Sequence, residues 1–455
     1  MVNLPLPIVK EFLSIYGLEV IYDSTRVKKL SQDFNWYSPI LKEELSNKIA
    51  DFVIRPLNID ALMTAVAIIA KRRIPLTVRG SGTGNYGQCV PLMGGIVLDV
   101  STLAGVSKMH NNMITSYAGT RLVDIDTYAL QYGSEIRMFP STFRSASVGG
   151  FFCGGSGGIG SLIYGRLADP GNIKEITICS VEENPKLTTL QAENTLGIHH
   201  AYGTNGIVVD VTLPVERVKN WVEQLYTFDT IYQAMDFCDY VSTSFTDNVR
   251  LLTLLEAPIA SFFKSLEIRM SPNDHAVILM TDKESSVPIK NVAIKAGGKT
   301  IITQPFSEIR IRGKTLIECT WNHTTLHAIK ADKQYTYLQT GYGSVLDYRN
   351  KLMLLKKNLG DKMVIHLEYV KNNGKLFVGG LPLIRYLGGT NLNEIIDIHN
   401  DAGVTITNPH VYTINLIGGL IPKNLYEYKD RFDPLGLMNG NKLPLITNPK
   451  TEVIA

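Results

Sequence analysis

Two glycine-rich segments, at 79–88 and 140–161, constrain this chain more than any other feature. Glycine adopts positive φ angles without strain and lets backbone N–H groups come close to a ligand. Consecutive N–H groups in such turns form a concave anion site. Two such segments in one region therefore predict a large phosphate-bearing ligand, such as a dinucleotide. The alternative is that the glycines serve only tight turns.

Both segments contain the spacing G-x-G-x-x-G, at 82–87 and 155–160. In a Rossmann site this motif follows a strand and opens a helix. Residues 89–95 read Cys-Val-Pro-Leu-Met-Gly-Gly and cannot form that helix. The second motif leaves room for only a short helix before Pro170. The sequence therefore excludes a Rossmann nucleotide site at both positions.

Apolar alternation and helix start signals divide the chain into four parts. We expect a helical lead-in at 1–50, a cofactor domain at 51–215, a substrate domain at 216–403 and a C-terminal segment at 404–455. Predicted strands lie at 75–79, 95–100, 114–119, 176–180, 206–215, 276–280, 316–320, 335–340 and 363–370. Predicted helices begin near 58, 121, 344 and 391.

Composition narrows the class of protein. The chain has 455 residues, 45% of them hydrophobic, and a net charge of +3, which argues against disorder and against nucleic-acid binding. Its five cysteines are dispersed, without CxxC pairs, and indicate thiols in a reducing compartment. We see no membrane-spanning run and no signal peptide, so we expect a cytoplasmic protein.

The strand followed by Arg-Gly-Ser-Gly-Thr and the later segment at 147–165 together resemble a known family. The family is the FAD-linked oxidases of the vanillyl-alcohol oxidase / p-cresol methylhydroxylase (PCMH) type, in particular their glycolate-oxidase-subunit-like branch. The resemblance covers about 50–215. It implies an α+β fold in which a PCMH-type FAD-binding domain of two α/β subdomains precedes an α+β substrate domain, an antiparallel sheet covered by helices.

The resemblance also implies which residues hold FAD. The first segment would cradle the pyrophosphate, the turn at 140–142 would lie beside the flavin, and the second glycine segment would line the ADP half. A turn at 203–207 would meet the adenine, and residues 439–442 would close over the flavin. The residues are Arg79, Gly80, Ser81, Gly82, Thr83, Gly84, Asn85, Gln88, Pro140, Ser141, Thr142, Ser147, Gly149, Gly150, Gly154, Gly157, Gly158, Gly160, Ile207 and Asn439.

The chain departs from the family in two respects. Members with covalent FAD often carry a histidine in the first segment, whereas Thr83 stands near that position here, so we expect non-covalent FAD. The chain also lacks the His-Gly-Asp-Gly-Asn stretch of metal-dependent 2-hydroxyacid dehydrogenases in this branch. We therefore expect no metal.

A flavin oxidation of a CH–OH group moves a hydride to flavin N5 while a base takes the hydroxyl proton. His323 is one candidate base, since helical spacing would place it on one face with His327. The same pair could instead bind a metal or be structural. His410, with Tyr412 to orient the substrate, is the other candidate.

Further polar residues have a functional and a structural interpretation. His366 and Glu368 share one strand face, so they line a pocket or are polar groups within the core. Arg310 and Arg312 also have two interpretations. One is a bidentate clamp for a substrate carboxylate, and the other is a solvated strand face, which is the commoner outcome for such a pair. The adjacent His199 and His200 are expected at the surface.

These patterns favour an FAD-dependent oxidoreductase that acts on a small organic acid or alcohol. One alternative is a redox-neutral flavoenzyme resembling alkylglycerone-phosphate synthase. Another is a flavin-binding subunit of a larger redox complex. A flavin reductase fed by a nicotinamide is a further alternative, although no Rossmann site is visible. The electron acceptor, and whether the chain forms a homodimer, stay open.

Overall fold

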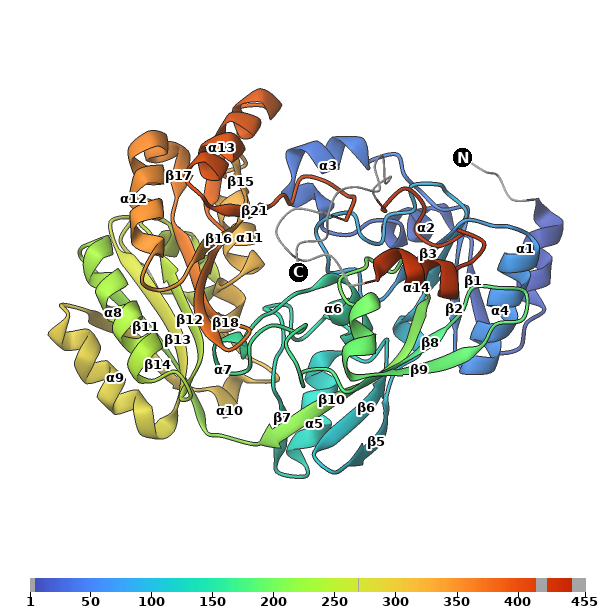
Figure 1. Cartoon of the computed structure of the whole chain (residues 1–455), viewed down its shortest axis with the longest axis horizontal. Helices are drawn as coiled ribbons and strands as arrows, with labels where there is room; N and C mark the ends of the chain where they lie inside the picture. Colours follow the sequence, from blue (N-terminus) through green and yellow to red (C-terminus); the bar gives the residue numbers. More distant parts are fainter. Residues whose placement is uncertain (1–4, 269, 415–423, 444–455) are drawn as a thin grey trace.

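The chain folds into two lobes that lie side by side, with the first lobe in blue to green and the second in yellow-green to orange (Figure 1). This architecture is that of a computed structural model, which describes residues 5–268, 270–414 and 424–443. The first lobe carries two sheets and the second is built on one large sheet. The mixed α/β architecture confirms the expected α+β class.

The first sheet of the first lobe presents the glycine segment at 79–88. Its strands run in the order β1-β2-β4-β3, and β2 and β3 are both parallel to β4. Helix α4 covers it and begins after Asn58, whose side chain accepts a hydrogen bond from the Ala61 N–H at 2.8 Å. The elements are β1 (Leu18–Ile21), β2 (Phe52–Pro56), α4 (Ile59–Lys71), β3 (Leu76–Arg79) and β4 (Ile96–Asp99).

The second sheet of the first lobe is antiparallel and runs in the order β5-β6-β10-β8-β9, with β7 paired to one end of β10. Its long central strand β10 is buried over most of its length, as its apolar sequence predicts. The elements are β5 (Val106–His110), β6 (Met113–Tyr117), α5 (Leu122–Leu130), β7 (Ser134–Ile136), α6 (Val148–Gly154), α7 (Ser161–Tyr164), β8 (Glu175–Cys179), β9 (Leu187–Gln191) and β10 (Ile207–Arg217).

The second lobe is an eight-stranded antiparallel sheet in the order β14-β11-β13-β12-β18-β19-β16-β21. Alternate strand residues such as Leu252 and Leu279 pack against α8, α9, α12 and α13, which cover its outer face (Figure 1). The intervening residues, such as Leu251 and Ile278, join the core of the first lobe. The strands are β11 (Trp221–Phe228), β12 (Val249–Leu255), β13 (His275–Asp282), β14 (Lys299–Pro305), β16 (Gln339–Gly343), β18 (His366–Asn372), β19 (Lys375–Gly380) and β21 (Thr405–Thr407). The helices are α8 (Ile231–Ser244), α9 (Lys283–Lys295), α12 (Tyr348–Leu359) and α13 (Gly389–Asp401).

One predicted strand is wrong. Residues 316–320 form a short 3-10 helix, Leu316–Cys319, which leads into α11 (Asn322–Ala331). The buried carboxylate of Glu223 accepts hydrogen bonds from the Thr315 hydroxyl and from the Leu316 N–H, at 2.8 Å for the latter. These contacts hold the backbone in a turn that an apolar pattern alone does not reveal.

Two predicted helix starts are displaced. Helix α12 begins at Tyr348 instead of near 344, because Ser344 donates its hydroxyl to Asp347 at 2.6 Å and caps no backbone N–H. Helix α13 begins at Gly389, two positions before the predicted cap.

The C-terminal part of the chain returns to the first lobe. Helix α14 (Leu425–Phe432), in red in Figure 1, packs its Tyr428 and Phe432 into the core of that lobe. Beyond it the backbone runs alongside β3, where the Leu76 N–H donates to the Leu437 carbonyl at 2.8 Å and the Asn439 N–H to the Leu76 carbonyl at 2.7 Å. Residues 437–439 therefore lie beside the start of the first glycine segment.

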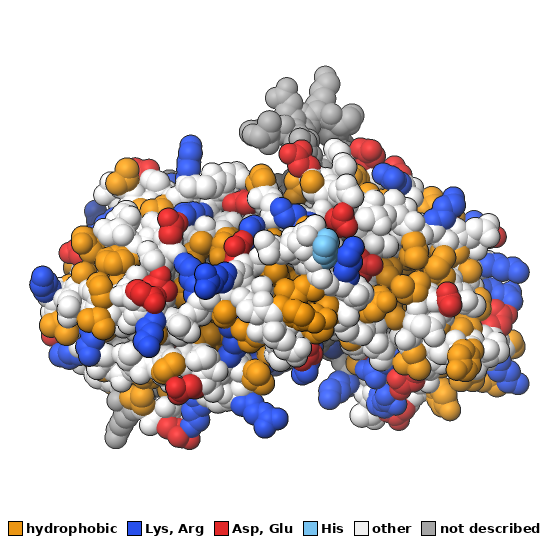
Figure 2. Space-filling view, turned by 90° about the horizontal axis from the view of Figure 1, so that it is seen from below, with side chains coloured by type: hydrophobic (Ala, Val, Ile, Leu, Met, Phe, Trp, Pro, Cys, Tyr) orange, Lys and Arg blue, Asp and Glu red, His pale blue; other side chains and the backbone are white. Residues whose placement is uncertain are grey.

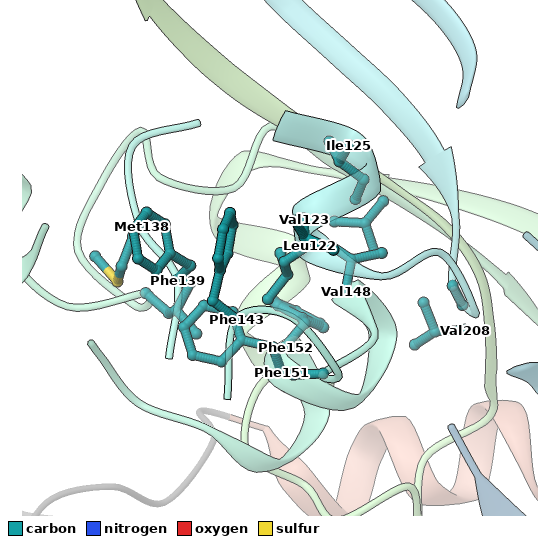
Figure 3. Close-up of a cluster of buried hydrophobic side chains, with 14 of the residues drawn as sticks. Leu122, Val123, Ile125, Met138, Phe139, Phe143, Val148, Phe151, Phe152 and Val208 are labelled. Atoms are coloured by element: carbon teal, nitrogen blue, oxygen red, sulfur yellow. The ribbon is translucent and has the colours of Figure 1, made fainter. Parts of the chain in front are cut away.

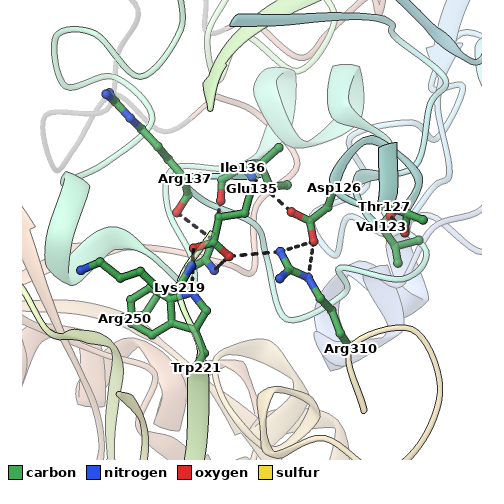
Figure 4. Close-up of polar contacts among 10 residues, drawn as sticks. All are labelled: Val123, Asp126, Thr127, Glu135, Ile136, Arg137, Lys219, Trp221, Arg250 and Arg310. Atoms are coloured by element: carbon green, nitrogen blue, oxygen red, sulfur yellow. Dashed lines mark hydrogen bonds and ion pairs between the residues drawn. The ribbon is translucent and has the colours of Figure 1, made fainter. Parts of the chain in front are cut away.

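A buried ionic network joins the two lobes (Figure 4). Glu135 accepts from Arg250 at 3.0 Å and from Arg310 at 3.2 Å through one oxygen, and from Trp221 Nε1 at 2.7 Å through the other. Arg310 also pairs with Asp126. The expectation of a solvated arginine face is wrong for Arg310, because this residue follows the short helix α10 (Phe306–Ile309) and turns inward.

All five cysteines are free thiols. Acidic and basic side chains are interspersed over the face in Figure 2, in keeping with the small net charge. Within the described ranges, no helix has both the length and the apolar character that a bilayer crossing needs.

Candidate active site

A cavity of about 310 Å³ lies where the lobes meet, within the size range of ligand pockets. Both glycine segments line it from the first lobe, and the N-terminal residues of α11 line it from the second. The predicted site residues on its wall are Gly80, Ser81, Gly82, Thr83, Gly84, Asn85, Gln88, Pro140, Ser141, Thr142, Ser147, Gly149, Gly150, Gly154, Gly157 and His323.

The first glycine segment exposes backbone donors to the cavity. It leaves the end of β3, and Gly82 has a φ of +66°, which only glycine adopts without strain. Among the described residues, the N–H groups of Gly82, Thr83 and Gly84 have no hydrogen-bond acceptor. Unpaired N–H groups in a row suit an anionic ligand.

Arg79 supports this segment from behind and is not on the cavity wall. Its guanidinium donates to the Gln32 carbonyl at 2.6 Å and to the Leu30 carbonyl at 3.3 Å. The prediction that Arg79 binds the cofactor directly is therefore corrected to a supporting role, because its donors are used by the N-terminal part of the chain.

A buried charge cluster stands behind the same segment. Lys442 donates to the Gln88 carbonyl, and burial lowers the pKa of its ammonium to about 8. Burial raises the pKa of the Asp33 carboxyl, whereas the charges of Lys442 and Arg79 act in the opposite direction. Two cations against one carboxyl leave this side of the cavity electropositive, which favours a diphosphate.

The second glycine segment rests on an aromatic core. Phe139 and Phe143 pack with ring centroids 4.2 Å apart, beside Phe151 and Phe152 of α6 (Figure 3). This core fixes the turn at 140–146 and the helix that follows it. This packing therefore holds the backbone on both sides of the turn in a fixed position relative to the cavity.

Two side chains connect the glycine segments. Ser147 Oγ accepts from the Ser81 N–H at 3.3 Å, and Gln88 Nε2 donates to the Gly154 carbonyl at 3.0 Å. A Cβ atom on Gly80 would lie 2.3 Å from Ser147 Oγ, and one on Gly84 would lie 2.0 Å from Gln88 Oε1. The glycines therefore allow both contacts, and the two segments form a single cradle.

Two predicted glycines do not line the cavity. A Cβ on Gly158 would lie 2.2 Å from the Phe139 carbonyl oxygen, and one on Gly160 would lie 2.1 Å from the Arg137 carbonyl oxygen. Both positions thus need glycine for close backbone packing. Their predicted role in lining the ADP half is corrected to a structural one.

Ile207 and Asn439 are likewise adjacent to the cavity and not on its wall. Ile207 is fully buried in the core, whereas the neighbouring Gly206 and Val208 line the cavity. Asn439 donates to the carbonyls of Tyr202 and Gln88, and its Oδ1 accepts from the Val78 N–H at 3.3 Å. Asn439 therefore joins three segments that border the cavity.

His323 is the predicted catalytic residue that the structure places on the wall. Its Nδ1 is buried without a hydrogen-bond partner among the described residues. Burial lowers its pKa to about 4, and the nearby His327 and Lys330 act in the same direction. The imidazole is therefore neutral at pH 7 and able to accept a proton.

An unusual backbone conformation orients this part of α11. Trp321, directly before the helix, has a φ of +51°, and its N–H donates to Glu368 Oε1 at 2.8 Å. The other oxygen of Glu368 accepts from Thr253 Oγ1 at 2.6 Å. His366 Nε2 lies 2.9 Å from Glu368. The His366–Glu368 pair thus supports the wall from within the core, which agrees with the second of its two interpretations, polar groups within the core.

His410 and Tyr412 lie behind the cavity. Both ring nitrogens of His410 are engaged, Nδ1 with Ser38 Oγ at 2.8 Å and Nε2 with the Tyr337 carbonyl at 2.9 Å. Tyr412 packs with Leu41, Leu45 and Val90. The placement of these two residues beside the flavin is therefore corrected, because loop 408–412 faces the N-terminal helices.

His199 and His200 are buried, which contradicts the predicted surface pair. His200 lines the cavity, and its Nδ1 lies 3.2 Å from the Gly155 carbonyl oxygen. Burial lowers the pKa of His200 to about 4 and that of His199 to about 3. Adjacent histidines in a polar stretch suggested exposure, but the 3-10 turn before them folds inward.

Sequence reasoning missed several wall residues. Tyr86 lies inside the first motif and Trp321 and Asn322 lie beside His323, so adjacency could have indicated them. Tyr202 directly precedes the predicted turn at 203–207, whereas Asp33 and Gln339 come from segments with no recognisable motif. They reach the cavity only through the tertiary fold.

Residues 50–178 match the FAD binding domain family. This region of the chain belongs to that family. A D-lactate dehydrogenase from Archaeoglobus fulgidus is 29% identical over 116 residues, which cover 25% of this chain and 26% of that protein. The glycolate oxidase subunit GlcD from Bacillus subtilis is 28% identical over 125 residues, 26% of each protein. The aligned part thus spans about a quarter of each relative.

The whole fold also has a counterpart among solved structures. The solved structure of an alkyldihydroxyacetonephosphate synthase superposes with a TM-score of 0.69. The superposition covers 97% of this chain and 85% of the synthase chain. The identity is 14%, so the likeness shows a shared fold. FAD is the cofactor that the family implies for residues 50–178.

The residues present fit FAD. The donors at 82–84 and the cations behind them suit its diphosphate, and the joined glycine segments keep Cβ atoms out of the cradle. The wall atom Asp33 Oδ2 is buried without a partner in the described part of the chain. Buried polar atoms are unfavourable unless a ligand or water completes their hydrogen bonds. When bound, FAD supplies two-electron redox chemistry.

Proposed function

We propose that the chain is an FAD-dependent oxidoreductase that oxidises a CH–OH group of a small organic acid or alcohol. The observation that carries this proposal is that both glycine segments and His323 line the same cavity. The cavity thereby combines a phosphate cradle with a neutral base. The relatives named as dehydrogenase and oxidase subunit agree with this chemistry.

In this proposal His323 removes the proton of the substrate hydroxyl. Its side chain forms no hydrogen bond with another described residue, so its nitrogens are available to a substrate. Glu368 is a positioning residue, since it holds the backbone N–H of Trp321, two residues before His323. General-base catalysis of this kind contributes about 10²–10⁴-fold in rate.

We further propose that FAD is held without a covalent bond. Residues 80–85 contain no histidine or cysteine. Cys89 and Cys153 also line the cavity, but burial raises the pKa values of their thiols to about 11 and about 12. Neutral thiols are poor nucleophiles.

The test compares His323→Gln with His327→Gln. His327 lies one helical turn further along α11, where its Nε2 is 3.0 Å from the Glu318 carbonyl oxygen. We expect His323→Gln to slow anaerobic bleaching of the bound flavin at least 100-fold with unchanged FAD content, and His327→Gln to change it less than fivefold. Equal rates in wild type and His323→Gln would contradict the role of His323.

A second candidate is a redox-neutral flavin reaction. The superposition on a synthase over 97% of this chain favours it. Turnover without any electron acceptor, and without net flavin reduction at completion, would decide for this candidate. A flavin-binding subunit is the third reading, and activity that appears only with a co-purified partner would decide for it.

A further inference from the structure

Three consecutive residues of the cavity wall have polar atoms without protein partners. They are Trp321, Asn322 and His323. Trp321 Nε1, Asn322 Oδ1 and His323 Nδ1 are all buried without a hydrogen-bond partner among the described residues, although the Asn322 side chain also interacts with the Tyr86 hydroxyl. Three such atoms on one short stretch are unusual, because buried polar groups are nearly always paired. A ligand at this wall would supply the missing partners.

The wall holds these residues in place. Trp321 has a positive φ and is tied through its N–H to Glu368, which Thr253 of β12 holds in turn. Thr324 Oγ1 donates to the Cys319 carbonyl at 2.8 Å and closes the same turn from the other side. The three unpartnered atoms therefore belong to a fixed surface supported by the sheet of the second lobe.

The chemistry of the three atoms defines a ligand. The indole N–H is a donor, the amide oxygen is an acceptor, and a neutral imidazole has one donor and one acceptor nitrogen. A hydroxyl group has one donor and two acceptor sites, so it pairs with all three atoms when Nδ1 of the imidazole carries the proton. A carboxylate only accepts, so it leaves the Asn322 oxygen unpaired.

The charge of the wall agrees with this assignment. Among the cavity-lining residues that the structure describes, Asp33 is the one with an acidic or basic side chain other than histidine. The cations that act on Asp33 lie behind the first glycine segment, where they face the phosphate cradle. A carboxylate at the α11 end would be desolvated against neutral lining groups, because Lys330, whose charge acts on His323, does not line the cavity.

We infer that Trp321, Asn322 and His323 form a binding subsite for an uncharged hydroxyl compound, an alcohol or a polyol, in preference to a carboxylate. This inference deepens the proposed function. The oxidation of the bound compound rests on that function, whereas its binding is measured independently. The hydroxyl would donate to the Asn322 oxygen and accept from the Trp321 indole N–H and from the His323 Nδ1–H.

The experiment uses matched pairs on the FAD-loaded protein. Each 2-hydroxy acid of three to ten carbons is compared with the 1,2-diol that has CH₂OH in place of its carboxylate. Calorimetry at pH 7 gives the dissociation constants. We expect the diol to bind at least tenfold tighter than its acid in the best pair. An acid that binds as tightly as its diol, or no binding by any member at 10 mM, would overturn the inference.

Two variants locate the subsite. Asn322→Leu removes the acceptor with little change in volume and is expected to weaken diol binding at least tenfold. Asn391→Leu is the matched control, because its amide oxygen is also buried without a partner but lies in α13 and away from the cavity wall. Equal diol binding by both variants would contradict the subsite.

Flavin bleaching separates this inference from the proposed function. Diols that bind at the subsite but never reduce the flavin would leave the inference standing and contradict the proposed oxidation. If the 2-hydroxy acids bind more tightly than their diols and reduce the flavin, the oxidation is supported and the subsite is contradicted.

Discussion

Buried histidines surround the candidate site, and burial controls their ionisation. It lowers the pKa of His200, His323 and His410 to about 4 and that of His199 to about 3. In the unfolded chain each would titrate near 6.5. Below pH 6.5 the unfolded state therefore binds more protons than the folded state. The stabilisation from these groups is fully present above pH 6.5 and is lost as the pH falls toward 4.

His410 provides a test of this pH dependence, because it is 3% exposed and is not on the cavity wall. A downward shift of this size corresponds to about 3 kcal/mol of folding free energy lost between pH 6.5 and pH 4. We expect the Tm of His410→Gln to fall less steeply from pH 7 to pH 4.5 than the Tm of the wild type. Thermal unfolding followed by circular dichroism measures this, and parallel slopes would contradict it.

At the scale of elements, the segment after α14 closes the first lobe through Asn439. Replacing Asn439 by glycine keeps its left-handed φ of 42° and removes the hydrogen bonds to Gln88, Tyr202 and Val78. We expect FAD affinity, measured by flavin fluorescence titration, to fall about tenfold, the worth of one to two hydrogen bonds.

Asn441→Gly is the control for this variant. Asn441 also has a left-handed φ, 66°, but its side chain is exposed, and its hydrogen bond within the described residues goes to the Met93 sulfur. Its FAD affinity should stay within twofold of the wild type. An equal loss of FAD affinity in both variants would contradict the role of the Asn439 side chain.

The contact between lobes depends on the Glu135 network. Glu135→Gln removes the carboxylate that Arg250 and Arg310 share and leaves both guanidiniums buried. Breaking a buried ion pair in this way costs about 3–5 kcal/mol. We expect a loss of that order in chemical unfolding, against about 0–1 kcal/mol for Glu216→Gln, whose pair with Arg137 is half-exposed. Equal effects would contradict the role of the network.

At the scale of the whole molecule, local patterns in the sequence predicted some strands of each sheet and the two glycine segments. They failed where a residue's partner is far along the chain. His410 binds Ser38 across 372 positions, and Asp33 reaches the cavity from the N-terminal helices. Gly158 and Gly160 looked like ligand glycines because close packing against a carbonyl and close approach to a phosphate both require glycine.

The central claim is that the joined glycine segments hold FAD without a covalent bond and serve a redox reaction. The most direct measurement is the visible absorption spectrum of the purified protein before and after acid precipitation. The account predicts a flavin spectrum that passes entirely into the supernatant and is identified there as FAD. A flavin that stays with the precipitate would contradict the non-covalent attachment. A colourless protein that FAD cannot reconstitute would contradict the functional account as a whole.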